Sequence, residues 1–309
     1  MPDGSLLVQM LIGALLGLSV YLPLAAGQLS LATPGFMTVG GYVAALLSTR
    51  VAALGAAEPL YPLPSLLLEL VLAAVIALAL ALVVGLPVLR LRGIYLAIAT
   101  IALNEILRVL LLNSSWTGGA VGIFAIPQPF GDPFGYLAAL LLLLLLAGAA
   151  CQVLAAHPLG RAMAAVRDDE LAASCSGVDS FRVKLLAFGA SAMLAALTGV
   201  LAAHFFNTWN ARQGSFDASI TTLAFVVFGG SRLWLGPVLG GLVLTALPEL
   251  LRPVGDLRLV VFGAVILLGP LLFPQGGVTP ALLQRLPLPA GWRSEEHTSE
   301  LQSPCNLVC

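Results

Sequence analysis

The chain has 309 residues, of which 59% are hydrophobic and 9% charged, whereas a soluble domain carries roughly 45–50% apolar and about 25% charged residues. A mean hydropathy of +1.01 over this length exceeds what one core can hide, so lipid must cover much of the surface. The net charge of −1 leaves no basic excess, which excludes nucleic acid as an expected partner. The four cysteines lack metal-ligand spacing, so no metal site is expected.

Eight or nine apolar runs approach the roughly 20 residues that a helix needs to cross a bilayer. Unpaired backbone amides are too costly in hydrocarbon, and the runs lack the alternation of barrel strands, so the predicted fold class is all-α. The protein is expected to be a polytopic membrane protein with eight or nine transmembrane helices, because the seventh run is too short to span comfortably. The runs are 5–25, 31–49, 65–88, 93–112, 134–155, 182–206, 218–230, 234–250 and 258–274.

The distribution of Lys and Arg predicts the orientation, since cytoplasmic loops carry the excess. Segment 157–184 contains four of these residues, whereas segment 113–133 contains none. The first segment is therefore predicted to face the cytoplasm and the second the outside, with an external N-terminus.

Two segments, 27–42 and 228–241, place helix-breaking Gly and Pro residues in mid-membrane. Non-helical backbone at that depth persists only where it is buried in protein or lines a wet cavity, so an interrupted pair predicts a transport pathway. The alternative is that the glycines allow close helix packing, and both can hold. The predicted pathway residues in these segments are Gln28, Ser30, Pro34, Gly35, Gly229, Gly230, Gly236 and Pro237.

The fourth run contains Asn104, Glu105 and Arg108, which we also assign to the pathway. Ionisable groups inside a span are functional by default because isolated charge is expensive there. The spacing of three places Glu105 and Arg108 on one helical face, and Arg108 can extend to the outer interface. We therefore expect an orienting ion pair near the external mouth rather than a substrate ligand. Glu69, His204 and Glu249 are expected to be interfacial.

Segment 157–184 is too polar to enter lipid and predicts a short amphipathic helix over 160–176. Its apolar face is expected to lie in the groove of a partner protein, or alternatively on lipid headgroups. Four acidic residues against four basic ones argue against anionic lipid as the main target. The residues of that face are Ala162, Met163, Ala165, Val166, Ala172 and Ala173.

Eight short motifs, occurring in one order between about residues 10 and 278, resemble those of the LivM-type permeases of branched-chain amino-acid ABC importers. The motifs are Gly-Gln-Leu-Ser-Leu (27–31), Leu-Arg-Leu-Arg-Gly-Ile-Tyr (89–95), Asn-Glu-Ile-Leu-Arg (104–108), Thr-Gly-Gly (117–119), Gly-Arg-Ala (160–162), Arg-Asp-Asp-Glu (167–170), Gly-Pro-Val-Leu-Gly (236–240) and Phe-Pro-Gln-Gly-Gly (273–277). One departure concerns the substrate, because Ala32-Thr33 stands where many members have Gly-His.

The resemblance implies a permease in a bacterial or archaeal cell (plasma or inner) membrane, paired with a LivH-like permease. It also implies two cytoplasmic ATPases and an external substrate-binding protein. The pattern Glu-x-Ala-Ala-x-x-x-Gly resembles a loose form of the motif that docks on the ATPase. The residues implied in ATPase coupling are Arg161, Arg167, Asp168, Glu170, Ala172, Ala173 and Gly177.

The sequence also contains no phosphate-binding Gly-x-x-x-x-Gly-Lys-Ser/Thr loop, since its single lysine, Lys184, follows Val183. If the protein is a pump, ATP must therefore be hydrolysed on partner chains, and no enzyme activity or bound cofactor is expected. The alternative functions are a stand-alone secondary transporter or channel and an intramembrane enzyme. Both are disfavoured because no buried set of acidic or histidine residues is evident.

The last 17 residues, 293–309, are polar and acidic, unlike the chain before them. Residues 293–304 resemble the translation of a sequencing-library adapter, so we expect the tail to be non-native and the permease domain to cover 1–292. A disordered cytoplasmic tail is the alternative.

Overall fold

The computed structural model describes residues 4–50, 63–231, 233–252 and 258–272, so the tail at 293–309 lies outside the described residues. Within these ranges, all nine apolar runs form helices whose ends fall within two residues of the predicted ones. They are α1 (Gly4–Ala25), α2 (Thr33–Arg50), α3 (Leu63–Val88), α4 (Ile94–Asn113), α5 (Pro133–Ala156), α8 (Ser180–Phe206), α9 (Phe216–Gly229), α10 (Leu235–Leu250) and α11 (Arg258–Leu272).

Five helices, α1, α3, α4, α5 and α8, are long and apolar enough to cross a membrane, and α9 and α10 are shorter apolar helices. The predicted all-α polytopic class is therefore confirmed. The one sheet in the described part is an antiparallel ladder of β1 (Ile123–Phe124) and β2 (Thr208–Trp209). Two short 3-10 helices, η1 (Ser115–Thr117) and η2 (Ala211–Gly214), complete the connections.

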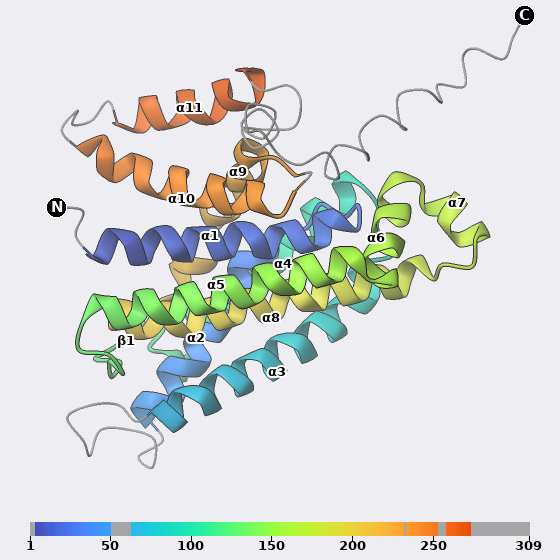
Figure 1. Cartoon of the computed structure of the whole chain (residues 1–309). Coiled ribbons are helices and arrows are strands. Elements are labelled where there is room, and N and C mark those ends of the chain that lie inside the picture. Colours follow the sequence, from blue (N-terminus) through green and yellow to red (C-terminus); the bar gives the residue numbers. More distant parts are fainter. Residues whose placement is uncertain (1–3, 51–62, 232, 253–257, 273–309) are drawn as a thin grey trace, which may run out of the picture.

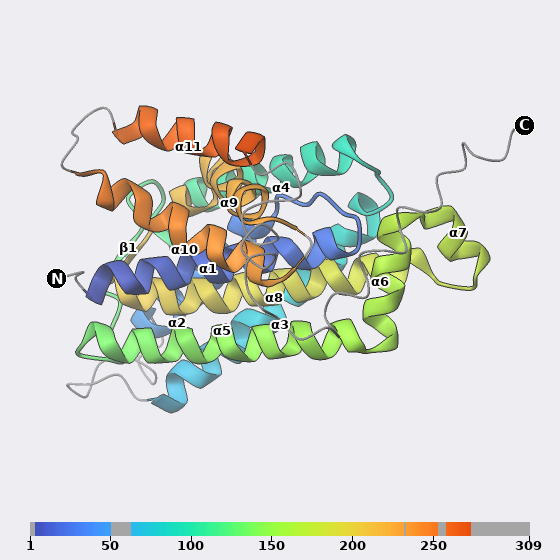
Figure 2. The ribbon, with the colours of Figure 1, turned by 45° about the horizontal axis from the view of Figure 1, so that its top comes forward.

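Helix α8 lies at the centre of the bundle, where α1, α2 and α3 pack against it (Figures 1 and 2). Its middle is rich in small residues, which let neighbouring backbones approach closely. A Cβ at Gly199 would overlap the Met37 carbonyl of α2, and one at Gly40 would overlap the Ala196 carbonyl of α8. Helices α3 and α5, by contrast, expose rows of Leu and Val side chains, as expected for surfaces that lipid covers.

The ends of the bundle separate the two loops that the charge distribution assigns to opposite sides. Helix α1 begins at the end where β1 lies and where α5 starts, whereas α6 (Pro158–Asp168) and α7 (Glu170–Cys175) lie at the other end (Figure 1). The turn after α3 lies at this second end, because Arg92 forms an ion pair with Glu170. The placement agrees with the prediction that 113–133 and 157–184 are on opposite faces of the membrane.

The single helix predicted over 160–176 is wrong, because the segment folds as two helices, α6 and α7. The break is at Asp169, whose backbone is extended (φ −154°, ψ 108°). Its carboxylate accepts hydrogen bonds from the amides of Leu171 and Ala172 and so satisfies the first turn of α7. We call residues 158–175 the α6–α7 hairpin.

The prediction that Pro and Gly interrupt the second span is also corrected. Helix α2 is continuous from Thr33 to Arg50, and Pro34 occupies its first turn, where a missing amide hydrogen is tolerated. The interruption instead precedes the helix, in the non-helical and mostly buried stretch 26–32. In the second segment, the chain leaves the helix at Gly230 (φ 98°), and Gly236 and Pro237 lie inside α10.

Candidate translocation site and coupling hairpin

Asn104 is fully buried on α4 and connects two segments that are distant in the sequence. Its amide nitrogen donates to the Leu31 carbonyl (2.6 Å) and to the Ser219 hydroxyl (2.8 Å). One turn earlier on α4, Thr100 Oγ1 accepts from the Leu31 amide (3.0 Å). Helix α4 therefore holds the end of the 26–32 stretch beside the first turns of α9.

The approach of α2 to α4 at this point depends on a glycine. A Cβ at Gly35 would overlap the side-chain oxygen of Asn104. That oxygen is buried and has no hydrogen-bond partner among the described residues. Gly214 of η2 lies similarly close to Thr38, since a Cβ there would be 2.9 Å from the threonine hydroxyl. The first turns of α2, the middle of α4 and η2 thus converge.

The 26–32 stretch contributes further polar groups. Gln28 is 2% exposed, and within the described part of the chain neither atom of its side-chain amide has a hydrogen-bond partner. The Thr33 hydroxyl is in the same situation, whereas Ser30 Oγ accepts a long bond from the Ala32 amide (3.5 Å). An unsatisfied buried polar group costs roughly 1–3 kcal/mol and needs an explanation such as water or a ligand. The 26–32 stretch and the start of α2 thus contain several polar atoms inside the bundle that are unsatisfied among the described residues.

The predicted ion pair between Glu105 and Arg108 is confirmed. Arg108 Nη2 lies 2.7 Å from Glu105 Oε2, and the two side chains are 31% and 34% exposed, respectively. The other carboxylate oxygen of Glu105 accepts from the Phe216 amide (3.2 Å), at the start of α9. A carboxylate stabilises a helix N-terminus. The pair therefore orients α9 against α4, and its place at the external mouth of a pathway stays a prediction.

The second Gly/Pro segment forms close backbone contacts instead. A Cβ at Gly229 would overlap the Gly236 carbonyl, one at Gly240 would overlap the Phe225 carbonyl, and one at Gly17 would overlap the Pro237 carbonyl. Small residues at such positions favour the packing interpretation for α1, α9 and α10.

The structure therefore divides the predicted pathway residues into two groups. One group, around the 26–32 stretch and α4, consists of Gln28, Ser30, Pro34, Gly35, Asn104, Glu105 and Arg108. The other, at the junction of α1, α9 and α10, consists of Gly229, Gly230, Gly236 and Pro237.

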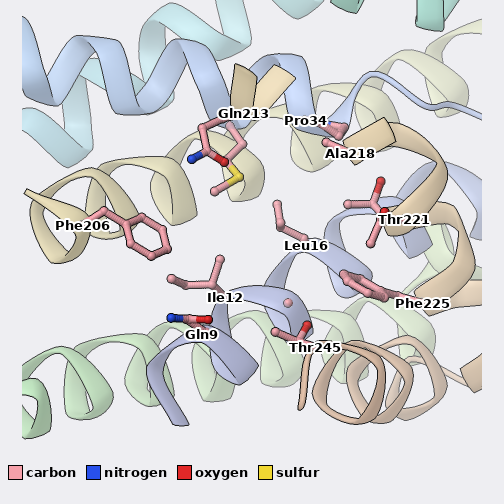
Figure 3. A pocket seen from close by; sticks show the side chains of 13 residues that line it. Gln9, Ile12, Leu16, Pro34, Phe206, Gln213, Ala218, Thr221, Phe225 and Thr245 are labelled. Atoms are coloured by element: carbon pink, nitrogen blue, oxygen red, sulfur yellow. The ribbon is translucent and has the colours of Figure 1, made fainter. Parts of the chain in front are cut away.

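A cavity of about 260 Å³ lies beside the first group, between α1, α2, α8, η2, α9 and α10 (Figure 3). Its walls are mainly apolar, and its polar residues are glutamines and threonines. Pro34 and Ala218, which precede Gly35 and Ser219 in the sequence, both line it. The cavity therefore adjoins the convergence around Asn104.

The α6–α7 hairpin is fixed to the bundle through its predicted coupling residue Glu170. The two oxygens of this carboxylate lie 2.8 Å from Lys184 Nζ of α8 and 3.4 Å from Arg92 Nε. Gly177, which follows α7, is exposed and has a positive φ of 83°, a conformation that favours glycine.

The expectation that the apolar face of this segment fits a partner is wrong for its buried members. Met163, Val166 and Ala173 pack inside this chain against Ala26, Val183 and Ala187. They face inward because α6 and α7 both pack against α8. The exposed side of the hairpin instead presents Arg161, Arg167, Asp168, Leu171 and Ala172.

The hairpin directly contacts the 26–32 stretch. Ala26 belongs to the apolar cluster under the hairpin, and a Cβ at Gly27 would lie 2.9 Å from the Cα of Arg167. A movement of the hairpin would therefore press on the backbone that leads to Leu31 and Asn104.

Sequence reasoning misplaced one buried pair. Glu69 and His204, expected at the interface, are both fully buried. His204 Nδ1 donates to the Pro127 carbonyl (2.6 Å), and its Nε2 is 2.6 Å from Glu69 Oε2. The pair connects α3, α8 and the 125–128 segment. The two residues lie on different helices, so no sequence spacing links them.

Ser219 and Thr100 were also missed, because isolated hydroxyls are common in apolar helices, where they bond their own backbone.

The helices and the convergence around Asn104 define a multi-pass membrane protein with a polar site inside the bundle. Residues 4–269 match the family model described as "Branched-chain amino acid transport system / permease component", and the chain belongs to this family. Among similar proteins, the "High-affinity branched-chain amino acid transport system permease protein LivM" of Salmonella typhimurium is 35% identical, with 89% of this chain and 69% of the relative covered.

The protein of the same name from Escherichia coli is 36% identical, with 84% of this chain and 66% of the relative covered. The chain thus spans about two thirds of the length of both relatives. No solved structure matches it. The predicted permease role is confirmed, as is the expectation of a non-catalytic subunit, and a stand-alone secondary transporter or channel is not favoured.

Proposed function

We propose that this chain forms part of the translocation pathway of an ABC importer for branched-chain amino acids in the cell membrane, the inner membrane where there are two. It would assemble with a LivH-like permease, two cytoplasmic ATPases and an external binding protein. The family match and the names of both relatives support the substrate class and the assembly. The observation that carries the pathway is the convergence of the 26–32 stretch, α2 and α9 on Asn104.

The convergence supplies what a pathway requires in a bundle of apolar helices. The described part of the chain offers unpaired buried polar atoms on Gln28, Thr33 and Asn104. Non-helical backbone at membrane depth is tolerated where it is buried in protein or lines a wet cavity, and discontinuous helices commonly bind substrate. With its start at the external side, the chain would cross the membrane eight or nine times.

The ATPase contact in this proposal is the exposed side of the α6–α7 hairpin. ATP would be bound and hydrolysed on the partner subunits. Because Gly27 contacts the backbone of Arg167, hairpin movement on ATPase closure would shift the 26–32 stretch. Glu170 transmits this movement to α8 and to the α3–α4 turn through Lys184 and Arg92.

The test is ATP-driven leucine uptake by liposomes that contain the full complex. Asn104→Ala removes the bonds to Leu31 and Ser219, so we expect uptake to fall about thirtyfold, in line with the loss of two hydrogen bonds of roughly 1 kcal/mol each. The matched control is Asn113→Ala on the same helix, whose side chain bonds only its own helix at the Val109 carbonyl among described contacts. Equal uptake by the two variants would contradict the assignment of Asn104 to the translocation pathway. Ion-driven uptake by this chain alone would support a secondary transporter.

A further inference from the structure

The cavity beside α1 and α9 has the dimensions and chemistry of a small-molecule site. Its volume of about 260 Å³ lies just below the roughly 300–1,000 Å³ of sites for drug-sized ligands. A ligand of a few heavy atoms, such as an amino acid, therefore fits the space better than a nucleotide or a peptide.

The apolar wall of the cavity suits a branched aliphatic side chain. Apolar residues of α1, α2, α8 and α9 face the space, with Phe206 and Phe225 on opposite sides and Leu16 between them (Figure 3). Burial of an aliphatic group against such a wall contributes roughly 1.5–3 kcal/mol. The apolar lining residues are Ile12, Leu16, Pro34, Met37, Phe206, Ala218 and Phe225.

The polar lining consists of neutral groups only, in the described part of the chain. The two glutamines, Gln9 and Gln213, lie on the Phe206 side of the cavity, and Thr221 and Thr245 lie on the Phe225 side (Figure 3). The Thr245 hydroxyl is buried and has no hydrogen-bond partner within the described ranges. Neutral donors and acceptors on both sides can bind the ammonium and carboxylate groups of a zwitterion.

The same lining rejects charged side chains. No ionisable residue is present among the described residues that line the cavity. A side-chain ammonium or carboxylate would therefore be buried without a counter-charge, which is strongly unfavourable. The lining thus selects neutral aliphatic amino acids over basic and acidic ones.

The position of the cavity places it on the route to Asn104. Its α1 residues, Gln9 to Leu16, extend from the second turn of that helix, near the predicted external end, to its middle. Its other wall contains Pro34 and Ala218, the neighbours of Gly35 and Ser219. A substrate that enters from outside would occupy the cavity before it reaches the buried amide.

We propose that this cavity is a transit site of the permease that holds the branched side chain of the substrate, so that the permease makes a second selection after the binding protein. The inference rests on the proposed function and deepens it, because it assigns selectivity to residues of this chain. We expect this site to bind the substrate weakly, because tight binding would slow the release of the substrate into the rest of the pathway.

Thiol protection tests the site without requiring transport. In the assembled complex, with the four cysteines of this chain replaced by serine, Ala218→Cys or Thr221→Cys introduces one thiol in the cavity wall. About 10 mM leucine should slow its labelling by a small methanethiosulfonate roughly tenfold for a Kd near 1 mM. Lysine and glutamate at the same concentration should have no effect.

Ala120→Cys in the exposed 113–133 segment, outside the cavity lining, is the matched control, and its labelling should not respond to leucine. Unchanged labelling at both cavity positions, or equal protection by lysine, would overturn the inference. ATP-driven leucine uptake by the wild-type complex separates the two proposals. Uptake without protection refutes the transit site and leaves the proposed function standing, whereas a complex without uptake refutes the proposed function.

Discussion

The two Gly/Pro-rich segments look alike in the sequence but have different surroundings in the structure. Segment 27–42 begins with non-helical backbone that α4 binds through Asn104 and Thr100. Segment 228–241 breaks at Gly230 and otherwise packs backbone against backbone on α1. Helix breakers occur in both segments, but among the described residues buried polar side chains accompany them only in the first, which is the segment that we propose for the pathway.

The composition of the two segments explains this contrast. Gln28, Ser30 and Thr33 supply buried polar atoms near the break of the first segment. The glycines of the second segment that pack closely instead meet carbonyl oxygens, at Gly236, Phe225 and Gly13. Substitutions should therefore damage folding in the second segment and transport in the first.

The largest effect is expected from Gly240→Val in the second segment. A Cβ at this position would overlap the Phe225 carbonyl. Backbone has little freedom to move away, so we expect a loss of roughly 3 kcal/mol or more, beyond the usual cost of overpacking. Detergent size-exclusion chromatography and thermal melting should show little folded protein.

Gly263→Val in α11 is the control for this loss, because a Cβ there meets no atom within 4 Å among the described residues. If the Gly240→Val protein melts at the same temperature as the Gly263→Val protein, the α9–α10 contact is not tightly packed. The interpretation of the second segment as a packing contact would then be wrong.

Gly35→Ala in the first segment should instead impair transport while leaving the protein folded. The added methyl group displaces the Asn104 side chain, which is more adaptable than backbone. We expect a stability loss of about 1 kcal/mol and an uptake loss of about tenfold, from the disturbed bonds to Leu31 and Ser219. Uptake and melting temperature are measured on the same preparation, and a variant that unfolds as readily as Gly240→Val would refute the distinction.

The helices were predictable from the sequence because apolar runs of sufficient length have few alternatives in a bilayer. The break at Asp169 was less predictable, because an aspartate that caps a helix and an aspartate exposed to solvent within a helix look the same in the sequence. The Asn104 bonds to Leu31 and Ser219 join residues 73 and 115 positions apart. Such contacts depend on tertiary packing, which residue spacing within one helix does not encode.

The same limit applies to Glu170, which the sequence assigns to ATPase docking and the structure pairs with Lys184 and Arg92. The sequence shows that Glu170 belongs to a motif, but only the folded structure shows which basic side chains pair with its carboxylate. The hairpin also connects the proposed ATPase contact to the first segment, because it contacts Gly27.

Glu170→Gln should give the smallest effect, because it loosens the hairpin and leaves the residues of both segments unchanged. The pair with Arg92 is partly exposed, and the glutamine oxygen can still accept a hydrogen bond from the buried Lys184, so the loss should be roughly 0.5–1 kcal/mol. ATPase activity should therefore persist while leucine uptake per ATP falls about threefold. Asp179→Asn is the matched control, because its ion pair with Arg182 is largely exposed. If the double variant Glu170→Lys with Lys184→Glu recovers uptake per ATP, the contact acts within this chain. If Glu170→Gln instead dissociates the ATPase, Glu170 is a docking residue and does not transmit hairpin movement to α8 and the α3–α4 turn.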